Sequence, residues 1–215
     1  MTTKEKLLAL LEDSKGTFFS GEEIARTLQV SRAAVWKAVN ALREDGYTID
    51  AVTNKGYRLS PDSDILSPQG IRRFLKPEYR GLNLTVLPTV PSTNALVREK
   101  ANQGCPEGCV IIVCEQTAGR GRYGRQFFSP ADTGVYLSLL LRPTAYSPQQ
   151  ATCLTAAAAA AMCQAIEAVT GQHPGIKWVN DIFLHGKKVC GILTEAAVGL
   201  ETGTLNYMVL GAGIN

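Results

Sequence analysis

The sequence predicts an α+β protein in which a winged helix-turn-helix precedes a mixed β-sheet domain with helices. Residues 1–60 carry three closely spaced helix patterns and then two short strand patterns. Residues 60–68, "SPDSDILSP", interrupt the composition with Pro, Ser and Asp. From residue 83 onward, strand-forming runs alternate with a short and a long helical segment. We therefore expect a winged-helix domain at 1–60, a linker with a short helix at 61–82 and a sheet domain at 83–215.

The first sixty residues contain the signals of three helices and a wing. The leucines of "KLLALL" lie at helical spacing. Ser20 and Glu23 form a capping-box pattern before "GEEIARTLQV", and Ser31 caps "RAAVWKAVNALRED", which ends at Gly46. A tight "LQVS" turn joins these two helices, as a helix-turn-helix requires. The runs "YTIDAV" and "GYRLS" then alternate like two strands around a turn at 53–56.

The third helix has one apolar and one polar face. The apolar stripe is Val35, Ala38, Val39 and Leu42. On the other face, Arg can read guanine, Asn can read adenine, and Lys and Ser can hold phosphates. The net charge of +3 is too small for a general polyanion binder, so a nucleic-acid contact needs such a local patch. A helical protein-interaction domain with a solvated face is the alternative; we favour DNA binding because the helix-turn-helix spacing and the wing occur together. The expected DNA-contacting residues are Ser31, Arg32, Trp36, Lys37, Asn40, Arg43, Lys55 and Arg58.

The composition, 45% hydrophobic and 19% charged, is that of an ordinary soluble globular protein. No secretory signal opens the chain, because "MTTKEKLLALLEDSKG" mixes apolar residues with charges. The run "ATCLTAAAAAAMCQAIEAV" is too weakly apolar for a membrane span and predicts a buried helix. None of the six cysteines forms a CxxC pair, and "CPEGC" has no nearby His, so we expect free thiols rather than zinc ligands. These features predict a cytoplasmic protein that does not associate with membranes.

The segment after residue 83 alternates between the sequence patterns of strands and those of helices. Strands are expected for "NLTVLPTV", "GCVIIVCEQ", "GVYLSLLLRP", "DIFLHGKKVCGILTEAAV" and "TLNYMVLGAGIN". Helices are expected for "STNALVREKANQG" and from Pro148 to Thr170, with a shorter one opened by Pro68. This pattern predicts a mostly antiparallel or mixed sheet backed by helices.

Three segments carry chemically informative residues. "PSTN" at 91–94 offers hydroxyls and amides at a helix start, which can bind an anionic group, although such residues are usually only caps. In "GRGRYGR" at 119–125, glycines let the backbone approach a ligand and arginines can grip phosphate oxygens. It fits neither a P-loop nor a dinucleotide fingerprint, and a nucleic-acid arm or a solvated loop is the alternative. "KWVNDIFLHGKKVCGIL" places amide, carboxylate and ammonium groups near one site, or is a charged surface hairpin.

Taken together, "STN", "GRGRYGR", "KWVND", "GKKVCGIL" and "GAGIN" closely resemble the catalytic domain of biotin protein ligases, a class II synthetase-like mixed sheet with helices. The winged helix, with "SRAAVWKAVNALREDGY" and "NKGYRL", resembles that of the bacterial members that are also biotin operon repressors. The resemblance covers nearly the whole chain. It implies an enzyme that makes biotinyl-5′-AMP from biotin and MgATP and passes biotin to a lysine of the biotin carboxyl carrier protein of acetyl-CoA carboxylase. It also implies a biotin-responsive transcriptional repressor.

The resemblance assigns roles residue by residue. The implied biotin-binding residues are Ser92, Thr93, Asn94, Gln116, Arg120, Gly121, Arg122 and Lys188. The implied adenylate and ATP residues are Gly119, Arg120, Gly121, Arg122, Arg125, Phe127, Lys177, Asn180 and Asn215. The implied catalytic residues are Arg122, Lys188 and Asp181, with Mg²⁺ arriving with ATP rather than at a fixed protein site.

The chemistry agrees with these roles. Attack of a carboxylate on the α-phosphate brings two anions together, so the site needs fixed positive charge aimed at the developing phosphorane. Arg122, Lys188 and Mg²⁺ would supply that charge, and Asp181 would orient the site electrostatically, for instance by pairing with the attacking lysine or the metal. Phe127 and Trp178 are expected as apolar or stacking walls.

Two features depart from the family pattern. Val179 replaces the proline of the usual "KWPND"; valine suits a strand, so we expect little functional damage. The sequence also stops at Asn215, directly after "GAGIN", where family members typically continue into a small β-barrel domain. Either this sequence is a fragment of a longer protein, or the protein works without that domain; in both cases ATP affinity and transfer to the carrier stay open.

Regulation follows from the same resemblance. Ligand binding would order the Arg/Gly loop and favour a homodimer whose winged helices reach paired half-sites of operator DNA. Two alternatives stay open at this point. One is a transcription factor that senses biotin or its adenylate without catalysis. The other is a lipoate ligase, against which the "GRGRYGR" loop argues.

Overall fold

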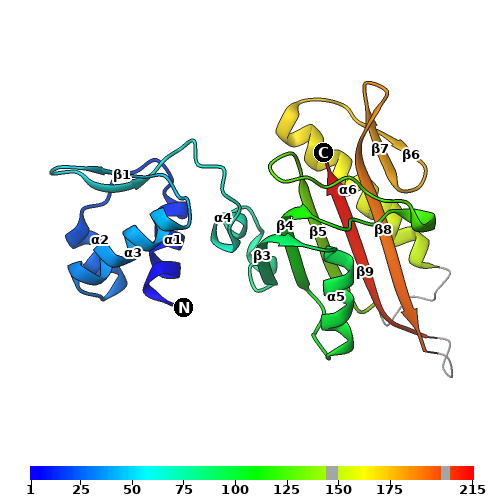
Figure 1. The fold of residues 1–215 in the computed structure, drawn as a ribbon, viewed down its shortest axis with the longest axis horizontal. Helices are drawn as coiled ribbons and strands as arrows, with labels where there is room; N and C mark the ends of the chain where they lie inside the picture. The colour runs from blue at the N-terminus through cyan, green and yellow to red at the C-terminus, as the bar shows by residue number, and fades with distance from the viewer. Residues whose placement is uncertain (144–149, 200–203) are drawn as a thin grey trace. The chain divides into compact units, whose positions relative to one another are not determined.

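The structure is a computed structural model that describes residues 1–143, 150–199 and 204–215. The chain divides into two compact units, Met1–Gly81 and Leu82–Asn215 (Figure 1). Residues 148 and 149, where the long helix was expected to begin, lie outside the described residues.

The first unit is a winged helix-turn-helix, as predicted. The three helices have the N-cap residues Thr2, Ser20 and Ser31. The hydroxyl of each cap accepts a hydrogen bond from a backbone amide of the first turn. Gly46 has a φ of +92°, the left-handed conformation expected just after a helix end. The elements are α1 (Thr3–Asp13), α2 (Gly21–Leu28), α3 (Arg32–Glu44) and the antiparallel wing β1 (Ile49–Val52) and β2 (Gly56–Leu59).

The core of the first unit contains the predicted stripe of α3. Val35, Ala38, Val39 and Leu42 are all buried. Around them pack buried residues of α1, α2 and the wing, namely Leu7, Leu8, Leu11, Ile24, Ile49 and Leu59. Because these apolar side chains face inward, the opposite side of α3 is left to solvent.

The segment expected as a linker is attached to α1. It contains α4 (Pro68–Arg72), behind the cap residue Ser67, and a 3₁₀ turn at Pro77–Tyr79. The Ser67 hydroxyl donates to Glu12 Oε1 at 3.4 Å, and Arg73 Nη1 donates to the Glu12 carbonyl oxygen at 2.6 Å. Glu12 is only 5% exposed, so residues 61–81 form part of the first compact unit.

The second unit is built on a seven-stranded mixed sheet, as predicted. The strand order is β3-β4-β5-β9-β8-β7-β6, with β3 and β4 parallel and every other neighbouring pair antiparallel. The elements are β3 (Asn83–Val90), α5 (Thr93–Asn102), β4 (Cys109–Gln116), a 3₁₀ turn (Arg122–Gly124), β5 (Val135–Leu141), α6 (Ala151–Thr170), β6 (Gly175–Lys177), β7 (Asp181–Leu184), β8 (Lys187–Val198) and β9 (Leu205–Ile214).

The two long helices cover opposite faces of the sheet (Figure 1). On β5, Tyr136 and Leu140 pack in the cluster that contains Val97 of α5, whereas Leu137 packs in the cluster that contains Ala159 of α6. Successive residues of a strand point to opposite faces, so the two clusters lie on the two sides of the sheet. The α5 face is the one that carries the predicted site.

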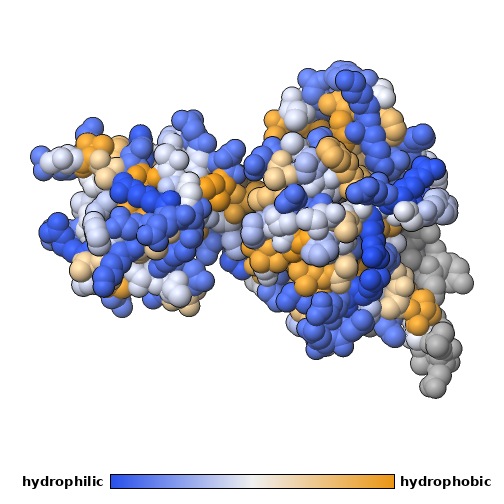
Figure 2. Space-filling model, in the orientation of Figure 1, coloured by the Kyte–Doolittle hydropathy of each residue, from blue (hydrophilic) through white to orange (hydrophobic). Residues whose placement is uncertain are grey.

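The expectation that α6 is a buried helix is wrong for its outer side. Ala159 is buried and Met162 packs partly against the sheet, but Val169 is 86% exposed. Cys153–Thr170 is long and apolar enough to cross a membrane by length and composition alone, and 11% of this window is buried. The helix packs through one stripe of apolar residues because it lies against a single sheet face. On the face shown in Figure 2, patches of hydrophobic residues lie among hydrophilic ones in both units.

All six cysteines are free thiols, as expected. Burial raises the pKa of the Cys190 thiol on β8 to about 12 and that of the Cys109 thiol on β4 to about 11. Both side chains are 1% exposed, so they act as small apolar core residues.

Candidate functional site

All eight residues that the resemblance assigned to biotin line one pocket on the α5 face of the sheet. They come from three separate segments: the start of α5, the end of β4 with the following loop, and the β7–β8 hairpin. Phe127 and Asn180, from the nucleotide group, line it too. The sheet therefore brings the three sequence segments to one place, although they are up to about a hundred residues apart.

Thr93 and Gln116 form the first part of the polar wall. Thr93 is the first residue of α5, and its backbone amide donates to Gln116 Oε1 at 2.9 Å. The Thr93 hydroxyl lies 3.1 Å from the same oxygen. Gln116 Nε2 donates to Ser129 Oγ at 3.0 Å, and the Ser129 hydroxyl donates to the Phe127 carbonyl oxygen at 3.2 Å. Gln116 thus satisfies an amide at the helix start and is held in one orientation.

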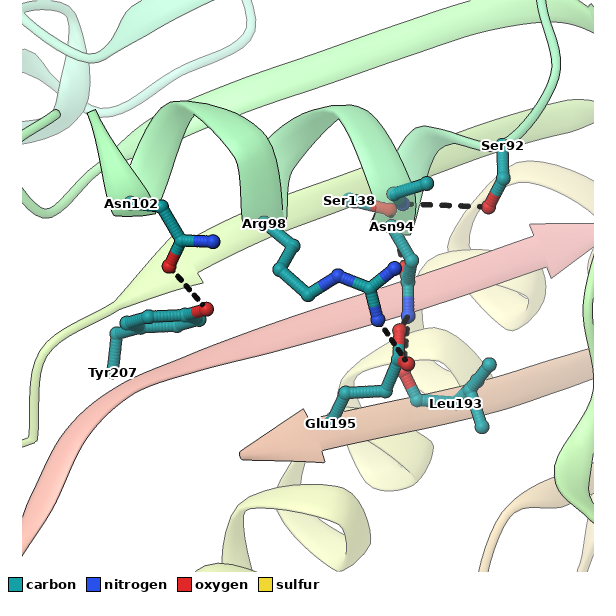
Figure 3. Close-up of polar contacts among 9 residues, drawn as sticks. Ser92, Asn94, Arg98, Asn102, Ser138, Leu193, Glu195 and Tyr207 are labelled. Carbon is teal, nitrogen blue, oxygen red and sulfur yellow. Dashed lines mark hydrogen bonds and ion pairs between the residues drawn. The ribbon is translucent and has the colours of Figure 1, made fainter. Parts of the chain in front are cut away.

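Asn94 forms the second part of the wall and ties α5 to the sheet. Its Nδ2 donates to Glu195 Oε2 at 2.8 Å and to the Leu193 carbonyl oxygen at 3.2 Å, both on β8 (Figure 3). The Ser138 hydroxyl, on β5, lies 2.6 Å from Asn94 Oδ1 and 2.7 Å from the Thr93 hydroxyl. Arg98, one turn further along α5, pairs with the other carboxylate oxygen of Glu195 at 3.3 Å. This network places the "STN" triplet against three strands.

Glycines of β8 and β9 make room for these side chains. A Cβ atom at Gly211 would lie 2.0 Å from Asn94 Oδ1, and one at Gly213 would lie 2.4 Å from the Phe127 ring. A Cβ at Gly191 would lie 2.8 Å from the same ring. The glycines of "GAGIN" are therefore needed for the close approach of Asn94 and Phe127 to the sheet.

The Arg/Gly loop closes on itself between β4 and β5. Gly121 N donates to the Arg125 carbonyl oxygen at 2.7 Å, and Phe127 N donates to the Gly119 carbonyl oxygen at 2.9 Å. A Cβ at Gly119 would lie 2.5 Å from the Phe127 carbonyl oxygen, so this position needs glycine. Within the loop, Arg120, Gly121 and Arg122 line the pocket. The loop is a hydrogen-bonded turn, unlike a repetitive nucleic-acid arm.

Two charged residues of the β7–β8 hairpin form an ion pair at the pocket. Lys188 Nζ lies 2.7 Å from Asp181 Oδ1, and Asn180 Nδ2 donates to the same oxygen at 3.0 Å. Lys188 is also 5.8 Å from the centre of the Phe127 ring. Asn180 Oδ1 accepts a hydrogen bond from Arg122 Nη1 at 2.9 Å. The hairpin and the Arg/Gly loop are thus joined through Asn180.

Other residues of the predicted site lie outside the pocket lining. Lys177 is exposed and stacks over Phe183, and Trp178 is 79% exposed. Asn215 donates to the Phe128 carbonyl oxygen at 3.1 Å. Val179 lies in the turn between β6 and β7, not in a strand as expected. The remaining predicted residues outside the lining are Gly119, Arg125 and Asp181.

Several pocket residues were missed by the sequence reading. Ser138 and Glu195 hold the Thr93 and Asn94 side chains, and Ser129 holds Gln116. Ser138 could have been noticed because it is a lone polar residue in the apolar strand "VYLSLLL". Ser129, Ser138 and Glu195 lie behind the pocket lining; the missed lining residues are Leu137, Gly191, Ile192, Leu193, Gly211, Ala212 and Gly213.

No group of three or more His, Cys, Asp or Glu side chains that could hold a metal ion occurs among residues 1–143, 150–199 and 204–215. Asp181, the carboxylate beside the pocket, is already bonded to Lys188 and Asn180.

The predicted DNA face of the first unit splits into two groups. Arg32, Trp36 and Lys37 are exposed on α3, and Trp36 is 57% exposed. Arg43 instead donates to the Ile49 carbonyl oxygen at 2.6 Å, and Arg58 pairs with Asp50 at 2.7 Å. The remaining predicted residues lie at the α3 cap (Ser31), on α3 (Asn40) and at the wing turn (Lys55).

Between α3 and the wing the first unit is hollowed. Arg32 and Trp36 line this hollow from α3, and Val52 and Asn54 line it from the wing. Arg43 and Arg58 brace the wing, whereas Arg32, Trp36 and Lys37 are exposed on the surface of α3.

Comparison with known proteins agrees with both units. Residues 86–215 match the biotin/lipoate A/B protein ligase family, and residues 3–58 match an HTH domain. Over 214 residues the chain is 41% identical to the bifunctional ligase/repressor BirA of Bacillus subtilis and 35% identical to that of Escherichia coli. Each alignment covers 100% of this chain but only 65% and 64% of those relatives, so the chain spans about two thirds of their length.

A solved structure shares the fold of the second unit. The biotin protein ligase from Aquifex aeolicus in complex with biotin and ATP is 30% identical, with a TM-score of 0.50. The match covers 62% of this chain and 52% of that one. The predicted fold class is therefore confirmed. With its family match over more than half of its length and its winged helix in front, the chain belongs to the biotin/lipoate A/B protein ligase family.

Proposed function

We propose that the protein is a biotin–[acetyl-CoA-carboxylase] ligase and a biotin-responsive transcriptional repressor. The observation that carries the ligase proposal is the convergence of Arg120, Arg122 and Lys188 on a pocket that is also lined by a network of neutral hydrogen-bonding side chains. Such a pocket suits a ligand that is polar and uncharged at one end and anionic at the other. Biotin, with its cyclic urea and its carboxylate, is a ligand of this kind.

The reaction needs two steps. In the first, a carboxylate oxygen of biotin attacks the α-phosphorus of ATP, and the bond to pyrophosphate breaks. In the second, the amine of a carrier lysine attacks the carbonyl carbon of the biotinyl adenylate, AMP leaves, and the amine loses a proton. The first step brings two anions together, so positive charge fixed around the phosphate lowers its barrier. Arg122 and Lys188 supply that charge, and Mg²⁺ enters as part of MgATP.

In this proposal Asp181 orients the site electrostatically through Lys188, with which it pairs on its own hairpin. In this role it holds the Lys188 ammonium beside Phe127 and aims it toward the pocket. The Lys188–Asp181 pair therefore positions the charge that receives the carboxylate and phosphate.

The repressor proposal rests on the winged helix. Arg32, Trp36, Lys37 and Asn40 of α3 would enter the major groove, and Lys55 of the wing would reach the neighbouring phosphates. The adenylate made in the second unit would be the corepressor. By ordering the Arg/Gly loop it would favour a homodimer that presents two winged helices to paired half-sites of operator DNA. A protein with these partners, DNA and a biotin carrier protein, would act in the cytoplasm.

The test is a two-readout assay with biotin, MgATP and a biotin carrier domain. We expect release of pyrophosphate and biotin attached to the carrier lysine. A protein that binds biotin or biotinyl-5′-AMP but yields neither product would be a sensor without catalysis, and the ligase proposal would fail. A parallel assay with lipoate and a lipoyl domain tests the lipoate-ligase alternative, because such an enzyme would attach lipoate to the lipoyl domain instead.

A further inference from the structure

The Asn94 side chain is oriented from outside the pocket by Glu195. Both Nδ2 hydrogens have acceptors, Glu195 Oε2 and the Leu193 carbonyl oxygen, so Oδ1 must face the Ser138 hydroxyl (Figure 3). Arg98 holds the second oxygen of Glu195. Asn94 is 5% exposed and Ser138 is fully buried, so the bond between these two side chains is shielded from water.

The oxygens in this wall outnumber the hydrogens available to them. Gln116 Oε1 and Asn94 Oδ1 can only accept, and Thr93 and Ser138 contribute one hydroxyl hydrogen each. Three oxygen–oxygen contacts join these four atoms, at 3.1, 2.7 and 2.6 Å. Two hydrogens cannot fill three contacts. The direction of the bonds therefore depends on which terminal oxygen, Asn94 Oδ1 or Gln116 Oε1, accepts a hydroxyl hydrogen.

Asn94 decides that direction. Its Oδ1 has no other hydrogen-bond donor within the described part of the chain, so it takes the Ser138 hydrogen. The Ser138 oxygen then takes the Thr93 hydrogen across the 2.7 Å contact. Gln116 Oε1 keeps only the Thr93 backbone amide, which fills one of its two lone pairs. Thr93 Oγ1 and Gln116 Oε1 are therefore left as acceptors in residues that line the pocket.

We propose that Glu195, anchored by Arg98, is a positioning residue that makes this wall of the pocket an acceptor surface for N–H groups of the ligand. If the Asn94 amide turned over, Nδ2 would face Ser138, the Ser138 hydrogen would pass to Thr93, and the Thr93 hydrogen would pass to Gln116. Gln116 Oε1 would then be filled, and Thr93 Oγ1 would keep only one free lone pair. A cyclic urea carries N–H groups that the acceptor wall can bind, whereas a dithiolane ring carries none. The identity of the ligand rests on the proposed function; the direction of the network does not.

The experiment compares Glu195→Ala, Glu195→Gln and the control Glu99→Ala by calorimetric titration with biotin, lipoate and ATP. Glu99 is an exposed carboxylate on α5 that accepts from Gln103 and lies outside the network. We expect Glu195→Ala to weaken biotin binding about tenfold, the scale of one well-placed hydrogen bond, with ATP and lipoate binding unchanged. Glu195→Gln should recover most of the affinity, because its amide oxygen can still accept from Asn94.

A second readout does not depend on the ligand. In NMR spectra of the protein alone, the Asn94 side-chain amide hydrogens should exchange slowly with solvent in the wild type and in Glu99→Ala, and fast in Glu195→Ala. If the wild type does not bind biotin but this contrast is present, the ligand proposal fails and the positioning role stands. Equal exchange in all variants, or a parallel loss of ATP binding in Glu195→Ala, would overturn the positioning role. Should Glu195→Ala not fold, Arg98→Ala can be used instead, because it keeps the Glu195 carboxylate but removes its bond to Arg98. We expect Arg98→Ala to weaken biotin binding by less than about tenfold.

Discussion

Arg122 Nη1 donates to Asn180 Oδ1 across 2.9 Å, which joins the Arg/Gly loop to the turn before β7. The two residues are 58 positions apart in the sequence and both line the pocket. Asn180 is itself fixed, because its Nδ2 donates to the Ile192 carbonyl oxygen at 3.2 Å. The Arg/Gly loop is thus bonded, through an exposed arginine that lines the pocket, to a residue that is itself bonded to β8.

Replacing this arginine should affect ligand retention more than folding. For Arg122→Ala we expect release of biotinyl-5′-AMP to become about tenfold to a hundredfold faster, the scale of a hydrogen bond to a charged group. The free energy of unfolding should change by less than about 0.5 kcal/mol, because the side chain is exposed. Stopped-flow dissociation and thermal melting measure the two effects. Unchanged release would remove the role given to the loop.

Lys188 offers a matched pair of variants within one hairpin. Lys188→Gln removes the charge that faces the pocket, whereas Lys187→Gln removes an exposed charge outside the pocket lining. We expect only the first to slow biotin-dependent pyrophosphate exchange, by at least about tenfold. The Lys188–Asp181 pair is partly exposed, so its loss should lower the free energy of unfolding by less than about 1 kcal/mol. Equal rates in both variants would contradict the assignment.

Gly211 tests the close approach of Asn94 to β9. An alanine there would place its Cβ 2.0 Å from Asn94 Oδ1, so the amide must move. We expect Gly211→Ala to lower the free energy of unfolding by about 1–3 kcal/mol, as overpacking does, and to weaken biotin binding. Gly175→Ala is the control, because a Cβ there meets nothing within 4 Å. Chemical denaturation and titration of both variants measure the difference; equal behaviour would show that Asn94 does not need the space.

Asn40 separates the two proposed activities. Asn40→Ala should weaken binding to the preferred DNA sequence by about tenfold, the discrimination of a good contact between a side chain and a base, and leave biotin affinity unchanged. Selection from random duplexes followed by fluorescence anisotropy supplies the measurement. Arg43→Ala should act differently, lowering the melting temperature of the first unit through its lost bonds to Ile49. A variant at Asn40 that binds DNA as the wild type does would exclude this residue from the interface.

Cys190 predicts a loss of stability in alkali. Its pKa is raised from an ordinary value of 9.0 to about 12, so the folded unit favours the neutral thiol. This contribution is fully present below pH 9 and is lost as the pH rises through the interval up to about 12, because the unfolded chain releases the proton first. Denaturant unfolding between pH 8 and 10.5 should show a falling free energy, with a shallower slope in Cys190→Ala. Identical slopes would indicate that the thiol titrates normally in the folded protein.

Local signals in the sequence were enough for much of the fold. The caps at Ser20, Ser31 and Ser92 were visible because each is followed by a helical pattern, and the long strands were visible as apolar runs. The short strand β6 was missed: its three residues are all exposed, so burial imposes no pattern on them. Val179 was expected in a strand for its side chain alone, but the chain turns there between two paired strands.

The pocket was predictable only as far as its segments carry recognisable motifs. The "STN", Arg/Gly and hairpin residues meet at one place, as the resemblance implied. Ser138 and Glu195 could not be assigned, because their partner Asn94 is 44 and 101 positions away and neither residue belongs to a motif. Which long-range pairs form depends on the strand order of the sheet, and that order leaves no local pattern.

The distance between these partners also has a consequence during synthesis. Asn94 leaves the ribosome about a hundred residues ahead of Glu195, and Gly211 and Gly213 follow later still. Until β8 has paired, the Asn94 side-chain amide lacks both of its acceptors, Glu195 and the Leu193 carbonyl oxygen, and the pocket lacks its lining from β8 and β9. A nascent chain therefore cannot bind the ligand before β8 and β9 are made, and the ligand can stabilise only chains whose sheet is already complete. Added biotin should protect the completed second unit from proteolysis, but it should not protect a ribosome-stalled chain that lacks β8 and β9.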